Sequence, residues 1–448
     1  MGNDPKIRTT LHDAEPTRAR WAILAFIFVI STITYVDRVN ISIAARYITK
    51  EYGLTDVEMG KIFSAFIFAY GLFQVPGGWL GDRYGPRIVL AGAVVWWSAF
   101  TSLTAMAHML PAALPVVWSL VLIRFFMGAG EAAAWPNFSR TIANWIPQKE
   151  RGIATSIPLM GGGFGAALTP PLIAWVMLRF GWQQGFHVCA AIGIVAAVGW
   201  YWYVRDSPGE HKNVNTEELR LIQGVEPPAP QVRSKTPWKA ILTDRNVWLL
   251  FCSAASCGYL VYIYMSWFYV YLVEERKLSV MQGSLYTTGP FIATVLITPL
   301  GGVISDWLTR RSGKTRSRRL VSMTGMILAA VALVIGVHAA NIKVAILGLS
   351  IGAGAIYLAL AAHWATTIDI SKEHAGTVFG VMNWGGNIGG MISPILTPIL
   401  VKRFGWTLAF EIAALIIFSG AFLWLLVKPE RPLQEPPRSI DDGDIRPT

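Results

Sequence analysis

A chain of 448 residues in which 53% are hydrophobic and only 15% are charged is too apolar to be built of soluble domains. Its net charge of +11 does not indicate a nucleic-acid partner, because the basic residues gather between apolar runs, where membrane topology explains them. The runs are about 20 residues long, enough to cross a hydrocarbon core of about 30 Å. The composition therefore predicts a polytopic membrane protein.

Twelve apolar runs predict membrane-spanning helices and an all-α fold. They are 21–46, 58–79, 87–108, 114–137, 152–178, 183–204, 247–273, 281–307, 319–339, 343–368, 375–401 and 406–427. Because the number of crossings is even, we expect both tails on the same side of the membrane.

Basic residues predict which side this is. One set of loops carries Arg83, Arg87, Lys149, Arg151 and the cluster 310–319, whereas the opposite loops carry few basic residues. Basic loops tend to stay in the cytoplasm, so both termini are expected there. The predicted organisation is a cytoplasmic tail (1–20), a six-helix bundle (21–204), a cytoplasmic linker (205–246), a second six-helix bundle (247–427) and a cytoplasmic tail (428–448).

An internal repeat relates the two halves. Gly301-Gly302 lies 224 residues after Gly77-Gly78, and the same offset carries the sequence Arg-Phe-Gly-Trp from 179–182 to 403–406. The chain is therefore predicted to be two copies of one six-helix unit, which run parallel because six crossings return to the same side. Parallel repeats of this kind place a binding site near the bilayer midplane, between bundles that rock against each other.

Glycines recur at matched positions of the two runs 152–178 and 375–401. They are Gly161, Gly162, Gly165, Gly385, Gly386 and Gly389. Glycine lets membrane helices approach closely, and singly each is more often a packing residue than a functional one. As a symmetric pair of glycine-rich helices, we interpret them as a sliding interface between the two bundles.

Apart from the ends of the predicted helices, four charged residues fall at membrane depth: Asp37, Arg38, Arg124 and Glu131. Unpaired charges there are costly and usually mark a functional site. Arg124 and Glu131 are seven residues apart and share one helix face, so we expect Asp37 and Glu131 to pair with Arg38 and Arg124. A purely structural network is the alternative, but buried pairs seldom repay their desolvation.

The second half lacks these charges. The offset of 224 carries Asp37 to Val261 and Arg38 to Tyr262, so the fold itself does not require them. We therefore expect the first bundle to handle charge and the second to offer neutral hydrogen-bonding and aromatic groups. The candidates are Tyr262, Tyr269, His363, Thr366, Thr367, Asn383 and Asn387, with Tyr70 and Gln74 in the first bundle.

The loop after the second predicted helix contains the pattern Gly-x-x-x-Asp-Arg-x-Gly-x-Arg, which ends in Asp82, Arg83 and Arg87; a degenerate copy contains Asp306. The pattern resembles the signature loop of the major facilitator superfamily, and the resemblance extends over roughly residues 20–430. It implies that superfamily's fold. It also implies that these four residues form a cytoplasmic gate that stabilises the outward-facing state.

Two carboxylates beside two arginines suggest that a proton is coupled to an anion. An anion that takes Arg38 removes a counter-charge from a nearby carboxylate and so favours proton uptake. The planar guanidinium of arginine suits a carboxylate because it can bind both oxygens. The expected mechanism is symport of an anion and a proton by alternating access.

Further motifs resemble the anion:cation symporter family, which includes bacterial galactonate, glucarate and hexuronate transporters and is related to sialic-acid and vesicular glutamate carriers. The matches include Tyr-Val-Asp-Arg-x-Asn at 35–40, Gln-Val-Pro-Gly-Gly-Trp at 74–79, Arg-Phe-Phe-Met-Gly-Ala-Gly-Glu at 124–131 and Gly386-Asn387. The resemblance implies proton-coupled uptake of a sugar acid (a hexonate, hexuronate or aldarate), with the proton as coupling ion and no cofactor.

The same resemblance implies roles for individual residues. Arg38 would hold the substrate carboxylate, with Tyr35, Tyr70 and Asn387 nearby. Asp37 and Glu131 would be proton sites, and Arg124 would partner Glu131. We expect a monomer in a bacterial inner membrane whose partners are lipid, protons and a small organic anion.

Other functions stay open at this point. An anion exchanger, or a carrier of inorganic phosphate or dicarboxylates, would use the same fold. A membrane enzyme or receptor is less consistent with the sequence, which contains no nucleophile constellation or metal-ligand pattern; Cys189, Cys252 and Cys257 lie within apolar runs without metal-ligand spacing.

Overall fold

The computed structural model describes residues 15–109, 115–147, 150–223, 237–371, 374–431 and 433, and this part of the chain is helical with no strand. The first half contains α1 (Ala19–Tyr52), α2 (Asp56–Tyr84), α3 (Pro86–Ala105), α4 (Val116–Glu131), α5 (Ala134–Trp145), α6 (Arg151–Phe180) and α7 (Trp182–Tyr203). The second contains α10 (Arg245–Ser266), α11 (Phe268–Glu274), α12 (Val280–Ser312), α13 (Lys314–His338), α14 (Ile342–Ile370) and α15 (Ala375–Phe422). The short helices α8 (Thr216–Gln223) and α9 (Trp238–Thr243) lie between them, and 3-10 turns occur at Ala107–Met109, Pro208–Glu210 and Leu423–Leu425.

Eleven segments of the described chain are long and apolar enough to cross a membrane, and the last of them contains two crossings. In α15 the backbone leaves the helical region at Gly405, where φ is 81° and ψ is 172°. A straight helix of its 48 residues would be about 70 Å long at 1.5 Å per residue, more than twice the thickness of the hydrocarbon core. The twelve predicted crossings are therefore confirmed.

Two crossings differ from the prediction in detail. The predicted helix 114–137 is interrupted after Glu131, and its continuation α5 runs to Trp145. The predicted helix 247–273 is interrupted at Trp267, between α10 and α11. Apolar composition alone could not locate these breaks.

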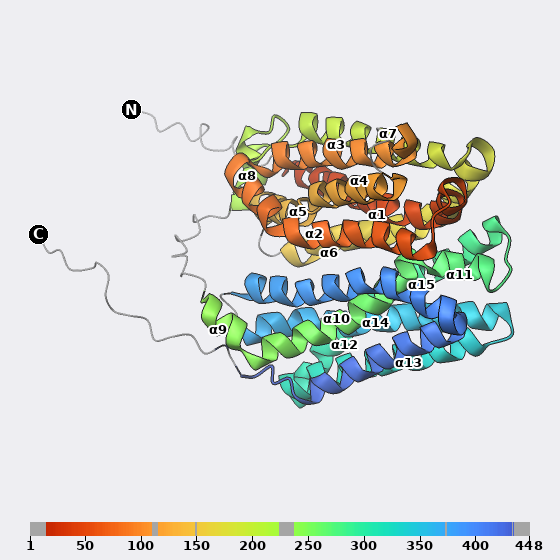
Figure 1. The fold of residues 1–448 in the computed structure, drawn as a ribbon. Coiled ribbons are helices and arrows are strands. Elements are labelled where there is room, and N and C mark those ends of the chain that lie inside the picture. The colour runs from red at the N-terminus through yellow and green to blue at the C-terminus, as the bar shows by residue number, and fades with distance from the viewer. Residues whose placement is uncertain are drawn as a thin grey trace, which may run out of the picture.

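The helices form two groups, which Figure 1 shows as layers with roughly parallel axes. Helices α1–α7 pack mainly with each other, as do α10–α15, and the groups meet where α2 contacts α15 and α6 contacts α12. The described chain begins and ends at the same end of the molecule, beside α8 and α9 (Figure 1). We call this the tail end and the opposite one, where α1 leads into α2, the far end. The predicted tails and linker lie partly outside the described residues.

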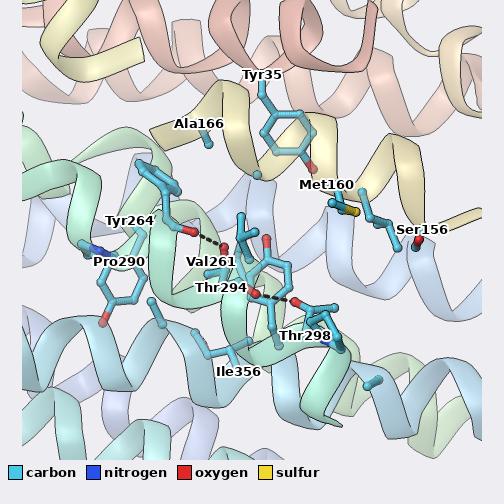
Figure 2. A pocket seen from close by; sticks show the side chains of 18 of the residues that line it. Tyr35, Ser156, Met160, Ala166, Val261, Tyr264, Pro290, Thr294, Thr298 and Ile356 are labelled. Atoms are coloured by element: carbon cyan, nitrogen blue, oxygen red, sulfur yellow. Dashed lines mark hydrogen bonds between the residues drawn. The ribbon is translucent and has the colours of Figure 1, made fainter. Parts of the chain in front are cut away.

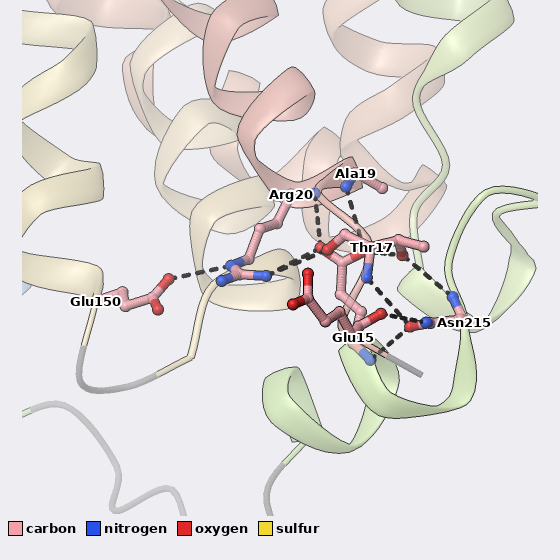
Figure 3. A network of polar contacts seen from close by, with 7 residues as sticks. Glu15, Thr17, Ala19, Arg20, Glu150 and Asn215 are labelled. Atoms are coloured by element: carbon pink, nitrogen blue, oxygen red, sulfur yellow. Dashed lines mark hydrogen bonds and ion pairs between the residues drawn. The ribbon is translucent and has the colours of Figure 1, made fainter. Parts of the chain in front are cut away.

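A polar network fixes the start of α1 at the tail end (Figure 3). The fully buried carboxylate of Glu218 on α8 accepts hydrogen bonds from the backbone N–H groups of Ala19 (3.2 Å) and Arg20 (3.1 Å) and from the hydroxyl of Thr17. The guanidinium of Arg20 bridges Glu218 and Glu150. Glu218 thus satisfies backbone donors that a helix start leaves unpaired, and it ties α8 to the first half.

Helix starts confirm the internal repeat. Both α2 and α12 begin with a capping box, Thr55 with Glu58 and Ser279 with Gln282, in which each side chain accepts from the other residue's backbone N–H. These two boxes are 224 residues apart.

The glycine-rich helices α6 and α15 both lie where the two halves meet, but their matched glycines face partners within their own half. A Cβ atom on Gly161 or Gly165 would meet the backbone oxygens of Phe28 and Thr32 on α1, and one on Gly389 would meet that of Ala255 on α10. Both α1 with α6 and α10 with α15 are pairs within one half. The two helices thus lie at the predicted interface and its sliding stays a prediction, whereas the matched glycines pack within each half, because sequence cannot say which neighbour a glycine face packs against.

These contacts also correct the repeat within α1 and α10. Gly161 meets Phe28, and its repeat partner Gly385 meets Phe251. In the same way, Gly165 meets Thr32 and Gly389 meets Ala255. The residues that matched glycines contact are therefore 223 positions apart, so the offset between α1 and α10 is 223 rather than 224. The structural counterparts of Asp37 and Arg38 are therefore Leu260 and Val261. Both are apolar, so the conclusion that the second half lacks these charges stands.

Candidate functional site

An ion pair joins α1 to α4 in the interior of the first half. Nε of Arg38 donates to Oε1 of Glu131 at 2.5 Å, and the two side chains are 8% and 0% exposed. Glu131 ends α4, where the chain turns into α5. Oε2 of Glu131 and Nη2 of Arg38 have no hydrogen-bond partner among the described residues. Each group therefore keeps capacity to bind a ligand or proton.

Asp37 and Arg124 are equally buried but are not paired with one another. Within the described chain, neither oxygen of Asp37 has a hydrogen-bond partner, although the indole of Trp97 lies beside it. Nη1 of Arg124 lies 2.9 Å from the sulfur of Met127, and its Nε is unpartnered among the described groups.

The predicted partnership of Arg124 with Glu131 is therefore not formed in this structure. Seven residues on one helix separate the two groups by about 10 Å along the axis, whereas Arg38 arrives from α1 directly opposite Glu131. The spacing predicted the shared face of α4 but not which arginine would reach its carboxylate.

Aromatic rings surround the Arg38 guanidinium. Its Cζ lies 4.3 Å from the ring centroid of Tyr70, 5.1 Å from Tyr35 and 5.4 Å from Phe66. Phe66 also lies 4.7 Å from Cζ of Arg124. Such ring faces attract a cation and keep it in place without consuming its hydrogen-bond donors.

A small cavity of about 20 Å³ separates the two arginines. It is lined by Arg38, Phe63, Phe66, Ile67, Arg124, Tyr262, Met265 and Ser266. Its volume suits about one water-sized group, so an anionic oxygen in this space would meet two guanidinium groups. The structure thus brings Tyr262, predicted from the second half, to the charged residues of the first.

Three other predicted residues lie in the seam between α2 and α15. Nδ2 of Asn383 donates to Oε1 of Gln74 at 3.3 Å. Asn387 packs against Gly71, and its Nδ2 has no partner among the described residues. Asn383 and Asn387 of the second half therefore both contact α2 of the first, and Asn383 does so through the amide of Gln74.

His363 and Thr367 lie elsewhere. His363 is 0% exposed; its Nε2 lies 2.9 Å from the hydroxyl of Ser253, and its ring packs against Trp424. The hydroxyl of Thr367 donates to the backbone of its own helix. The structure encloses both within the second half and brings neither to the arginines, because α14 turns that face toward α10 and α13. Sequence could not distinguish this face of α14 from the one that faces the first half.

A larger cavity of about 310 Å³ lies between the halves, and the sequence did not predict most of its lining (Figure 2). It is bounded by Tyr35 of α1, by α6, and by faces of α10, α12 and α14. Tyr35 is the only predicted substrate-binding residue that lines it. Tyr357 on α14 was missed, since its helix face is otherwise apolar and resembles a packing surface.

The predicted gate residues make contacts within their own halves. Asp82 lies 3.6 Å from Arg140 on α5, and the backbone N–H of Arg87 donates to Asp206 after α7. Arg83 lies over Trp79 and Tyr84. Asp306 pairs with Arg318, which also reaches Asp369.

Contacts between the halves concentrate toward the far end. Arg46 of α1 pairs with Asp56 of α2 and with Glu274 of α11. The hydroxyl of Ser64 donates to the backbone of Met391, on the opposite half. The large cavity reaches instead to Ser156, near the tail-end start of α6. The described halves are thus joined mainly toward the far end, and the seam of α2 and α15 continues to the contact of Gln74 with Asn383.

The sequence from 27 to 389 matches the model of the Major Facilitator Superfamily, with a second match over 314–444. The chain belongs to the Major Facilitator Superfamily. Members of this superfamily are membrane transporters, so this protein is a multi-pass membrane transporter and not an enzyme. Solved structures agree with the fold: a bacterial homologue of the lysosomal transporter Spinster, inward-facing and unoccupied, has a TM-score of 0.75 at 19% identity over 92% of this chain and 97% of that one.

Curated relatives place this superfamily member near transporters of organic anions. It is 32% identical to a probable sulfoacetate transporter of Cupriavidus necator over 96% of this chain and 98% of the relative. It is 31% identical to a probable galactarate/D-glucarate transporter of Escherichia coli (87% and 88%) and 30% identical to a hexuronate transporter of Bacillus subtilis (90% of each). The predicted likeness to the anion:cation symporter group of the superfamily is thereby confirmed.

Proposed function

We propose that this protein is a proton-coupled symporter that imports an organic anion, with a sugar acid (hexonate, hexuronate or aldarate) as the class suggested by the names of its relatives. The buried pair of Arg38 and Glu131 is the observation that carries the proposal. It puts an anion-binding cation and a titratable group in direct contact, so a ligand on one alters the other.

Coupling follows from competition for Arg38. A substrate carboxylate that binds this guanidinium displaces Glu131, which is fully buried and has no other cation within ion-pair distance in the described chain. A buried carboxylate that has lost its counter-charge favours the protonated form. Anion and proton are then taken up together and released together.

The other two buried charged residues, Arg124 and Asp37, contribute to binding of the anion and the proton. Arg124 faces the same small cavity as Arg38, so it can hold the second oxygen of a carboxylate placed between them. Asp37, whose oxygens are unpartnered among the described groups, is a second proton site. The amides of Gln74, Asn383 and Asn387 lie where the substrate's hydroxyl groups would reach when the seam of α2 and α15 opens.

We place the tail end in the cytoplasm of a bacterium with an inner membrane, because the loops at this end carry the basic residues. The far-end contacts then correspond to an inward-facing state. The loops with Asp82, Arg83, Arg87 and Asp306 would meet across the halves in the outward-facing state, and the protein would work as a monomer of two bundles joined by the segment 205–246.

Uptake into proteoliposomes tests the symport proposal. With an imposed pH gradient, acid outside, D-glucuronate or D-glucarate should accumulate inside above its external concentration. A proton ionophore should abolish this accumulation, so that the internal and external concentrations become equal. Arg38→Ala should abolish uptake, whereas Arg179→Ala, on an exposed arginine at the far end, should not. Accumulation that ignores the gradient would overturn proton coupling, and uptake only into vesicles preloaded with substrate would indicate an exchanger. Phosphate and dicarboxylates are added as competing substrates. Strong competition by one of them would indicate the remaining alternative, a carrier of inorganic phosphate or dicarboxylates.

A further inference from the structure

The large cavity of about 310 Å³ is chemically unlike the charged site beside it. Its lining side chains are mostly aliphatic, aromatic or methionine, and come from α6, α10, α12 and α14. Among them are Met160, Val261, Phe291 and Ile356, and Figure 2 shows Met160, Val261 and Ile356 on three different helices around the cavity. Its volume is at the lower end of those that hold small organic ligands.

Most hydroxyl donors in its wall are already used by the protein. The hydroxyl of Thr294 donates to the carbonyl of Phe291 at 2.7 Å, and that of Thr298 donates to the carbonyl of Thr294 at 2.6 Å (Figure 2). The hydroxyl of Tyr264 donates to Leu349 at 2.8 Å. Among the described groups, the phenols of Tyr35 and Tyr357 and the indole N–H of Trp364 remain without a hydrogen bond.

The cavity adjoins the anion site. The ring of Tyr35 lines the cavity and also lies 5.1 Å from the Arg38 guanidinium. Met265 lines both the large cavity and the small one between the arginines. A molecule whose carboxylate binds Arg38 can therefore extend past Tyr35 toward the apolar space.

Two kinds of substrate can be compared by the part of the molecule beyond the carboxylate, which we call the substrate body. A sugar acid would bring several hydroxyl groups to a wall with two free phenols and one free indole N–H, and a buried hydroxyl without a partner loses the hydrogen bonds that it had in water. An aromatic body of the same size gains from removal of apolar surface from water and from contact with the surrounding rings. The wall thus rejects a polyhydroxylated body more strongly than an aromatic one.

We propose that this cavity is the subsite for the body of the substrate and that it selects a monocarboxylate with an aromatic ring over one with a polyhydroxylated ring. This inference rests on the proposed function for the carboxylate site at Arg38, and it replaces the sugar acid that the relatives' names suggest with an aromatic monocarboxylate. The internal repeat is consistent with this apolar subsite, because the position in the second half that corresponds to Arg38 is Val261, which lines the cavity.

Calorimetric titration of the full-length protein in detergent tests the proposal with benzoate and D-glucuronate, two monoanions with six-membered rings. Binding is the readout because protonated benzoic acid crosses bilayers unaided. We expect benzoate to bind at least tenfold more tightly. Arg38→Ala should lose both ligands. Tighter binding of D-glucuronate would overturn the aromatic subsite while leaving the symport proposal intact, whereas equal binding by wild type and Arg38→Ala would overturn the anion site itself.

Near-isosteric variants test the cavity wall directly. Met160→Gln and Val261→Thr add hydrogen-bonding groups without a large change in volume, so each should lower the preference for benzoate over D-glucuronate by at least threefold. Val195→Thr makes the same exchange at an exposed site on α7 and should leave the preference unchanged. If both cavity variants retain the wild-type preference while binding benzoate normally, the cavity does not hold the substrate body.

Discussion

Glu131 depends on a single cation. In the described chain only Arg38 lies within ion-pair distance of its carboxylate, and both side chains are almost completely removed from solvent. Truncating one member of a buried pair leaves the other uncompensated, which costs several kcal/mol. A ligand that engages Arg38 therefore has a direct effect on the charge of Glu131, and no long pathway is required for coupling.

Glu131→Gln separates binding from coupling. Glutamine keeps the shape of the side chain but cannot release a proton, so we expect accumulation driven by a pH gradient to fall at least 100-fold while exchange of internal for external substrate continues. Counterflow and gradient-driven uptake, measured on the same proteoliposomes, check this. Glu275→Gln, at the end of α11, is the control of equal charge and should retain both activities. Gradient-driven accumulation by Glu131→Gln would remove this residue from the proton path.

At the scale of elements, glycine decides how closely the central helices approach. A Cβ atom on Gly389 would lie 1.9 Å from the backbone oxygen of Ala255, and one on Gly161 would lie 2.5 Å from that of Phe28. Backbone cannot yield as a flexible side chain can, so these positions fix the pairs α10 with α15 and α1 with α6. The bundles are internally rigid at these pairs, which suits motion of one half against the other.

Gly389→Ala tests this packing. The added methyl group should separate α15 from α10 and destabilise the protein by about 1–3 kcal/mol, as overpacking does elsewhere. Thermal unfolding of the purified protein should show a lower midpoint. Gly380→Ala, on the same helix but with nothing within 4 Å of the added atom, should be neutral or slightly stabilising because alanine favours helix. Equal midpoints for the two variants would show that the α10–α15 contact tolerates separation.

At the scale of the whole molecule, one ion pair links the halves across the far end. Arg46 contacts Asp56 within the first half and Glu274 in the second. All three side chains are partly exposed, between 32% and 45%, and exposed pairs contribute roughly 0–1 kcal/mol. That is enough to bias two conformations of similar energy without locking either.

Glu274→Gln should shift the protein toward the state that is open at the far end by up to about fivefold, the equivalent of about 1 kcal/mol. Spin labels at positions 50 and 277, in a protein whose exposed Cys252 is replaced by serine, would report the change as a larger population of long distances. Asp56→Asn removes a charge from the same cluster but no contact between the halves, so its distances should match wild type. Unchanged distances in Glu274→Gln would exclude the pair as a conformational bias.

The amino-acid sequence was sufficient to predict the twelve crossings, the two parallel copies and the four buried charges. It could do so because crossing a membrane demands long apolar runs, and any charge within them stands out. The resemblance of residues 35–40 and 124–131 to the symporter family likewise needed only the chain itself.

Which of these groups meet became clear from the packing of the helices and not from the sequence. This packing paired Glu131 with Arg38 rather than with Arg124, turned His363 away from the space between the halves, and joined Tyr357 to an apolar cavity beside Tyr35. A helix in a membrane can be apolar on every face, so its periodicity does not show which face lines a cavity. That choice depends on rotations and close approaches between helices distant in sequence.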